Sequence, residues 1–301
     1  MDSFWIILTG SLVAVSCGIL GCYLVLRKMA MIGDAISHAV LPGIVLAFLF
    51  TGSRDSIVML AGAGAIGVLT TFLIEFFHRQ AKLQADAAIG VTFTWLFAMG
   101  IILISWKANQ IDLDQDCVLY GEIAFISLNT FDFGNGILIP KSVVIMSSVL
   151  AIIILFVSVG YKELFLTTFD PGYASAIGIS TVLWHYLLMG MVSLSTVAAF
   201  DNVGAILVVA FMIAPAATAY LLTDKFERMI TIAVISGILS SAGGYYLASL
   251  LDGSIAGAMS AVAGLQFILA LLFAPENGVI TKKLRKPETG RQRIEMLNAE
   301  A

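Results

Sequence analysis

One apolar stretch of the sequence brings a carboxylate and an imidazole within reach of each other. Asp34 and His38 lie four positions apart in MIGDAISHAVLPGIVL, so a helix places both on one face, and Ser37 adds a hydroxyl nearby. Pro42 has no N–H and leaves the carbonyl of His38 without its helical donor. Carboxylate plus imidazole suits manganese, iron or zinc. The stretch therefore predicts a site for a divalent transition metal; a capping aspartate and a histidine in one interhelical hydrogen bond are the alternative.

A further carboxylate, Glu122, lies in the apolar stretch CVLYGEIAFI at 117–126, which is too short to span a bilayer. Such a stretch is typical of a re-entrant segment that is buried in protein or lines a cavity. Glu122 would then bring a carboxylate toward the same path. A solvated glutamate in an outer surface loop is the alternative.

Transmembrane helices must position these residues. Of the 301 residues, 59% are hydrophobic and only 12% are charged, against about 25% in soluble domains. The charges fall between long apolar runs, each near the roughly 20 residues that cross a bilayer, and strand alternation is absent. We therefore expect an all-α polytopic bundle of about nine spans, at 4–26, 31–51, 56–77, 87–106, 141–160, 183–201, 203–222, 229–251 and 254–274. The pair around Asp201 and Asn202 could instead be a broken or re-entrant element, so eight to ten spans are possible.

Basic residues predict the orientation of the bundle. Lysines and arginines of short loops stay in the cytoplasm. With the N-terminus outside and the C-terminus inside, most of them lie on the inner side: Arg27, Lys28, Arg79, Lys82, Lys162, Lys225, Arg228 and six residues of the tail. We therefore divide the chain into a transmembrane domain at 1–280 and a basic cytoplasmic tail at 281–301. No charge run outside that tail suits nucleic acid.

The inner connection at 161–182 is longer than a turn. Its sequence YKELFLTTFDPGYASAIGISTV is only moderately hydrophobic, and Asp170-Pro171-Gly172 interrupts it. We expect a short helix lying at the cytoplasmic face. The chain has no Walker A motif, so an ion gradient or a separate subunit must supply the energy. A catalytic role for Ser37 and His38 is not expected, because one helical turn supplies no oxyanion site.

Three stretches resemble the metal-type ABC permeases, the family that serves manganese, zinc and iron importers. They are GDAISHAVLPG at 33–43, DLDQDCVLYGEI at 112–123 and VGAILVVAFMIAPAATA at 203–219. The similarity runs from about residue 10 to about residue 275. It implies a type II, vitamin B12-type importer fold in a bacterial inner membrane, with no permanently bound cofactor and no enzymatic activity of its own.

The resemblance also implies roles for residues and partners. Asp34, His38 and a glutamate like Glu122 would meet the transported metal ion. The segment at 163–180 would dock the ATPase, and the residues assigned to this coupling role are Glu163, Phe169, Asp170, Pro171 and Gly178. The implied partners are a cytoplasmic ABC ATPase dimer, a second permease that is the same or a related chain, and an extracytoplasmic metal-binding protein.

Two other transport classes compete with this interpretation. A proton-coupled secondary metal transporter would use Asp34 and His38 as a relay, and it would leave the segment at 161–182 without a role. A permease for a siderophore or vitamin would need a wide cavity with few ligands, which a metal-coordinating pair in mid-membrane disfavours. The sequence leaves open which metal is carried and whether the permease pair is a homodimer.

Overall fold

The computed structural model describes residues 2–52, 56–107, 123–128, 130–132, 138–275 and 278–281. Within these ranges, nine segments are long and apolar enough to cross a membrane, which confirms the expected span count. The helices that form them are α1 (Asp2–Leu26), α2 (Ile32–Ala39) with α3 (Leu41–Thr51), α4 (Ser56–Gln80), α5 (Ala85–Lys107), α7 (Lys141–Val159), α10 (Thr181–Val203), α11 (Ala205–Leu222), α12 (Phe226–Leu251) and α13 (Ile255–Phe273). α10 and α11 are separate spans joined at Gly204, so the pair around Asp201 is not a re-entrant element.

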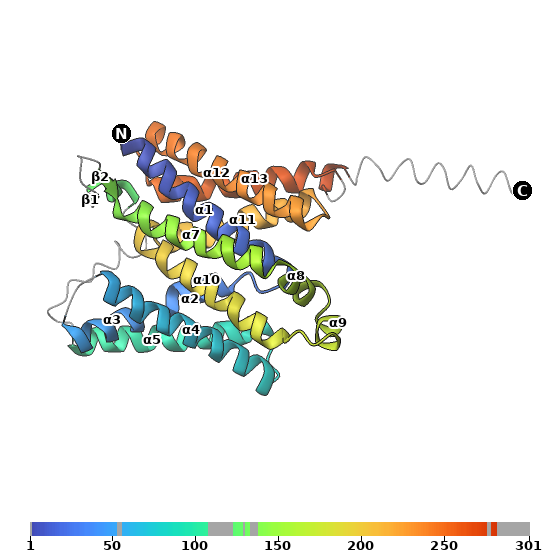
Figure 1. Cartoon of the computed structure of the whole chain (residues 1–301). Coiled ribbons are helices and arrows are strands. Elements are labelled where there is room, and N and C mark those ends of the chain that lie inside the picture. The colour runs from blue at the N-terminus through green and yellow to red at the C-terminus, as the bar shows by residue number, and fades with distance from the viewer. Residues whose placement is uncertain are drawn as a thin grey trace, which may run out of the picture.

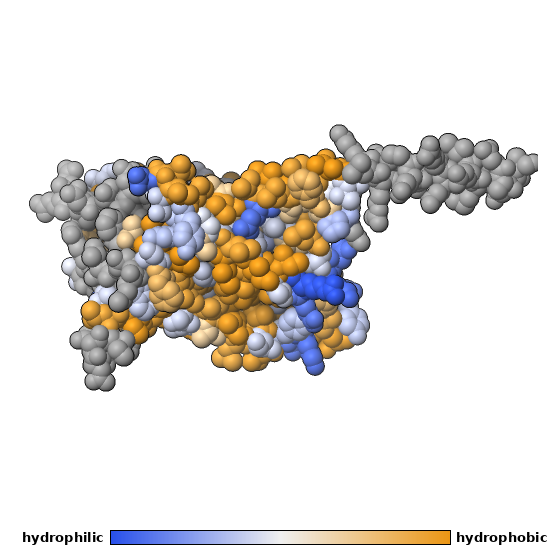
Figure 2. All heavy atoms as spheres, turned by 90° about the horizontal axis from the view of Figure 1, so that it is seen from above, coloured by the Kyte–Doolittle hydropathy of each residue, from blue (hydrophilic) through white to orange (hydrophobic). Residues whose placement is uncertain are grey.

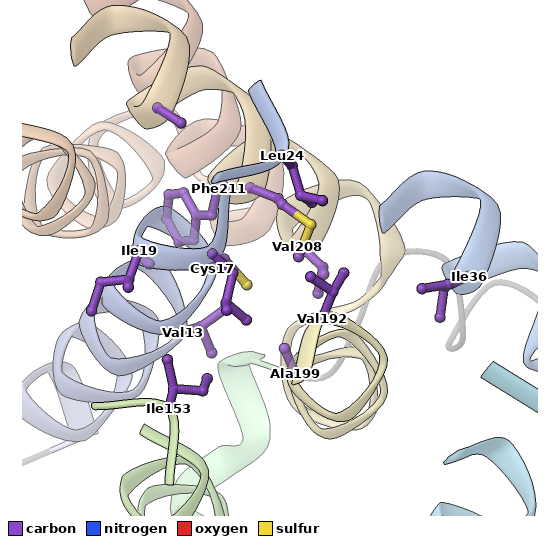
Figure 3. Packing of buried hydrophobic residues seen from close by; sticks show 14 of the residues in the cluster. Val13, Cys17, Ile19, Leu24, Ile36, Ile153, Val192, Ala199, Val208 and Phe211 are labelled. Carbon is purple, nitrogen blue, oxygen red and sulfur yellow. The ribbon is translucent and has the colours of Figure 1, made fainter. Parts of the chain in front are cut away.

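The helices form two groups joined by α10 (Figure 1). α1 packs on α11 and α12, while α2, α3, α4 and α5 pack on one another. α10 contacts both groups, through α1 on one side and α4 and α2 on the other. Buried apolar side chains fill the region where α1, α7, α10 and α11 meet, as Figure 3 shows around Cys17, Val192 and Phe211.

Two glycines, Gly21 and Gly33, allow α11 to pack closely against α1 and α2. A methyl group at Gly21 of α1 would overlap the backbone carbonyl oxygen of Met212 on α11. One at Gly33 of α2 would overlap the Met212 sulfur. Small residues permit such packing where lipid supplies no hydrophobic drive for association. Gly33 directly precedes Asp34, so this contact helps to place the predicted metal site.

The second span is not one continuous helix. α2 ends at Ala39 and α3 begins at Leu41, with the Val40 carbonyl accepting from the N–H groups of Gly43 and Ile44 at 2.9 and 3.1 Å. Pro42 lies in the first turn of α3, where a missing N–H costs nothing. The proline thus divides the span instead of only removing one helical bond.

The inner connection contains two short helices where one was expected. They are α8 (Tyr161–Phe169) and α9 (Pro171–Ala176), and the Asp170 carboxylate caps α9 by accepting from the Tyr173 N–H at 2.9 Å. Both helices lie at the end of the bundle opposite the N-terminus (Figure 1). Figure 2 shows a largely apolar face whose hydrophilic residues gather toward that end.

The outer connection is only partly described. It contains the 3-10 helix η1 (Ile123–Leu128) and the antiparallel strands β1 (Thr130–Asp132) and β2 (Leu138–Pro140). Glu122 and the stretch at 112–121 before it lie outside the described residues, as does the basic tail from 282 onward.

Candidate functional site

Asp34 and His38 form a pair on α2. The His38 Nε2 atom lies 3.5 Å from Asp34 Oδ1, and the two side chains are 37% and 29% exposed, respectively. The spacing of four residues produces this contact, as the sequence predicted. The pair is therefore partly accessible inside a membrane-spanning segment, which is what a site for a passing ion needs.

The Ser37 hydroxyl does not join this pair. Its oxygen is buried and donates to the carbonyl of Gly33 at 2.9 Å, one turn back on the same helix. A serine in a helix has this local acceptor available, so proximity in sequence did not bring it to the site.

Aromatic rings of α5 flank the imidazole. The ring centroid of His38 lies 6.0 Å from that of Phe93 and 5.9 Å from that of Phe97. The histidine therefore faces α5 across the gap between the two helices. These rings occupy the space beside the imidazole, whose Nε2 atom faces the Asp34 carboxylate.

The described residues supply two protein ligands at this site, Asp34 and His38. Within the described ranges, no group of three or more histidine, cysteine, aspartate or glutamate side chains could hold a metal ion. Glu122, the predicted third ligand, lies outside those ranges. A two-ligand set leaves most of a dication's coordination positions to water, so it suits weak and reversible binding.

A second ionisable pair was not singled out from the sequence. Glu75 of α4 and His185 of α10 lie 3.1 Å apart, with side chains only 6% and 13% exposed. Both positions fall inside the apolar runs expected at 56–77 and 183–201. The rule that an ionisable residue inside a span is a functional candidate would have found them.

The predicted coupling residues lie on or beside α8 and α9. Phe169, Asp170, Pro171 and Gly178 are exposed, and Glu163 is half-buried in the first turn of α8. Gly178 has a φ of 87°, in the left-handed region that favours glycine, and it lets the chain turn into α10. The segment is thus largely exposed at this end of the bundle.

Apolar groups and a hollow accompany these residues. Phe169, Tyr173 and Ile177 are 51%, 55% and 50% exposed, although they lie at the hydrophilic end of the bundle. A pocket of 610 Å³ lies between α8 and the start of α12, lined among others by Tyr161, Lys225 and Arg228. Burial, together with the Glu227 carboxylate, raises the pKa of Tyr161. Exposed apolar groups at a polar end indicate a protein contact.

Comparisons with known proteins agree on one family. The model of the ABC 3 transport family matches residues 3–274. The chain is 52% identical to the manganese transport system membrane protein MntD of Bacillus subtilis over 281 residues, covering 93% of this chain and 95% of that protein. It is 41% identical to the zinc transport system membrane protein TroD of Treponema pallidum over 279 residues, covering 93% of this chain and 76% of that one.

A solved structure shares the fold. The structure of PsaBC from Streptococcus pneumoniae in complex with a Fab matches with a TM-score of 0.76 and 31% identity, covering 93% of this chain and 94% of the matched chain. The likeness therefore extends over nearly the whole chain.

Proposed function

Because the chain belongs to the ABC 3 transport family, we propose that it is the membrane-spanning permease subunit of an ABC importer that carries manganese or zinc into the cytoplasm. It is a multi-pass protein of the bacterial cytoplasmic membrane. The observation that carries the proposal is the paired carboxylate and imidazole of Asp34 and His38, partly accessible within a span. The manganese and zinc relatives cover almost the whole chain, so the proposal applies to the bundle as a unit.

Asp34 and His38 would meet the metal in transit. An ionisable side chain inside the bilayer costs several kcal/mol unless it is paired or hydrated. A passing dication lowers that cost and gains an oxygen and a nitrogen ligand in place of water. Because a transport site must release what it binds, a small set of protein ligands fits the task better than a closed cage. We assign Glu122 as a third ligand on the outer side of this path.

A separate ATPase would power the transport. The chain has no Walker A motif, and we assign the docking role to α8 and α9, with Glu163, Phe169, Asp170, Pro171 and Gly178 at the contact. The exposed apolar side chains of this segment support that assignment. A proton-coupled carrier would leave the segment unused, so the family and the exposed segment both favour the ABC importer over it.

A second permease, the same or a related chain, would pack on α5. The outer face of this helix holds small residues one turn apart, Gly90, Thr94 and Ala98, which line a hollow of 440 Å³ with Val91 and Trp95. Small residues let helices of neighbouring subunits approach closely. An adjoining face of α5 carries Phe93 and Phe97 against His38, so this arrangement places the metal path close to the subunit boundary. An extracytoplasmic metal-binding protein would dock at the outer end, where β1 and β2 lie.

Filling the α5 hollow is expected to separate the two permeases. In Gly90→Leu the added side chain enters the hollow and blocks close approach, so the second permease should be lost from complexes purified through a tag on this chain. Gly64→Leu is the matched control, because a side chain at Gly64 of α4 also meets open space. Mass measurement of the detergent-solubilised complexes reports both variants. A Gly90→Leu complex of parental mass and parental uptake would refute this interface.

Metal uptake tests the function as a whole. We expect a host lacking its own manganese and zinc importers to regain uptake of one of these metals when the chain is expressed with its ATPase and partner subunits. Cellular manganese, zinc and iron should be measured together. Uptake should persist when a protonophore collapses the proton gradient and ATP is kept high. Uptake that stops with the gradient under these conditions would establish the proton-coupled alternative instead.

A further inference from the structure

One arginine ties α8 to the interior of the bundle. Arg27 lies in the connection between α1 and α2, and its side chain is largely buried. Its Nε donates to the Thr168 hydroxyl and its Nη2 donates to the Thr167 hydroxyl, each at 3.0 Å, and both threonines belong to α8. Its Nη1 lies 3.4 Å from Nδ1 of His185 on α10. Three nitrogens of one guanidinium thus reach two different helices.

The direction of each hydrogen bond in this network follows from the chemistry of its groups. A guanidinium has donors only, so Nδ1 of His185 accepts from Arg27 and the ring proton lies on Nε2. That proton points to Glu75 Oε2, which lies 3.1 Å from Nε2 of His185. On the other side, Thr168 and Thr167 each donate to the Leu164 carbonyl, at 2.6 and 3.2 Å. The network therefore runs without a break from Glu75 through Arg27 into the backbone of α8.

This network is not a second metal site. Glu75 and His185 offer the same group types as Asp34 and His38, but a guanidinium occupies Nδ1 of the imidazole. Burial lowers the pKa of Arg27 only to about 10, so the side chain keeps its positive charge at neutral pH. A fixed cation beside the imidazole repels a dication. The Glu75 carboxylate balances the positive charge of Arg27, and the imidazole of His185 lies between the two groups.

The network connects the two parts of the proposed transport cycle. α8 is the proposed contact with the ATPase, and Arg27 precedes Asp34 by seven residues on the chain that enters α2. Glu75 and His185 lie on α4 and α10, and both of these helices pack on α2. A displacement of α8 therefore reaches α2 by two routes, along the chain through Arg27 and across the packing through His185 and Glu75.

We propose that Arg27 is a positioning residue that transmits movement of α8 to the Asp34–His38 pair, with Glu75 and His185 holding its guanidinium in place. The inference rests on the proposed function, because it takes α8 as the ATPase contact and Asp34 and His38 as the metal path. It assigns the transmission to the hydrogen bonds of Arg27 with Thr167, Thr168 and His185. Substitutions can remove the bonds to one helix at a time.

The test compares metal moved with ATP hydrolysed. The complete transporter is reconstituted in proteoliposomes, and manganese and zinc uptake is divided by the ATPase rate. For Arg27→Gln we expect hydrolysis to continue and this ratio to fall roughly fivefold or more, the lower end of usual coupling between sites. Lys28→Gln is the matched control, because it removes an adjacent charge that is exposed, and its ratio should equal the parental one.

Further variants separate transmission from general stability. Arg27→Lys keeps the charge but lacks the planar guanidinium and its several donors. Its ratio of uptake to hydrolysis should therefore be little higher than that of Arg27→Gln. Thr167→Val with Thr168→Val should lower the ratio as Arg27→Gln does, and combining all three should add no further loss. If the ratio of uptake to hydrolysis in Arg27→Gln equals the parental ratio, the inference is wrong, whether or not both rates have fallen. A parental complex that hydrolyses ATP and moves neither metal would overturn the proposed function itself.

Discussion

His38→Ala is expected to lower metal uptake more than about tenfold while the protein still assembles with its ATPase, since loss of a group that only supports a metal ligand already costs about 10–100-fold. The imidazole is one of the two ligands that the described part of the site supplies, at 3.5 Å from Asp34. Removing it leaves a carboxylate alone in the membrane, with no nitrogen ligand to replace the ion's water. Uptake should be measured at matched expression levels, with ATPase co-purification reported alongside.

Neighbouring substitutions distinguish coordination from packing. Asp34→Ala should be as defective as His38→Ala, and Asp34→Glu should keep part of the activity, because the carboxylate remains within reach of the imidazole. Ser37→Ala is the matched control on the same turn, since the Ser37 hydroxyl only donates to Gly33 and should be dispensable. His38→Ala protein that imports metal at the parental rate would remove Asp34 and His38 from the proposed path.

Replacing the exposed apolar side chains of the coupling segment should abolish uptake while the spans still fold. Exchanging the whole stretch at 163–180 would also remove Leu164 and Thr167, which are buried against the bundle. The sharper variant changes Phe169, Tyr173 and Ile177 to serine, because their side chains are half exposed. Of the three, Phe169 also packs its ring on Phe165 and Phe226, at 4.6 and 5.9 Å between centroids, so folding of the variant is checked alongside. We expect the ATPase to dissociate, or to hydrolyse ATP without moving metal.

The control for this variant lies at the opposite end of the molecule. Leu138→Ser changes a side chain on β2 that is 56% exposed and far from α8 in Figure 1. It should leave ATPase binding unchanged, so co-purification of the ATPase is the readout that this control shares with the triple variant. Normal transport by the Phe169, Tyr173 and Ile177 triple variant would show that the ATPase docks elsewhere.

The sequence by itself determined the helical class, the nine spans and the contact between Asp34 and His38. Each of these depends on neighbours along the chain. A span follows from an unbroken apolar run, because the bilayer requires every backbone polar group to be satisfied within the helix. The Asp34–His38 pair follows from a separation of four residues, which any helix converts into proximity. The family resemblance added the expected partners, and the comparisons placed the chain in that family.

Only the tertiary structure decided which distant residues meet. Nothing local links Arg27 to Thr167, Thr168 and His185, or His185 to Glu75, because these contacts depend on how four separate segments pack. Packing also decided that Ser37 is buried. Helix packing in a membrane depends on close fits such as Gly21 against Met212, and hydrophobicity patterns carry no record of them.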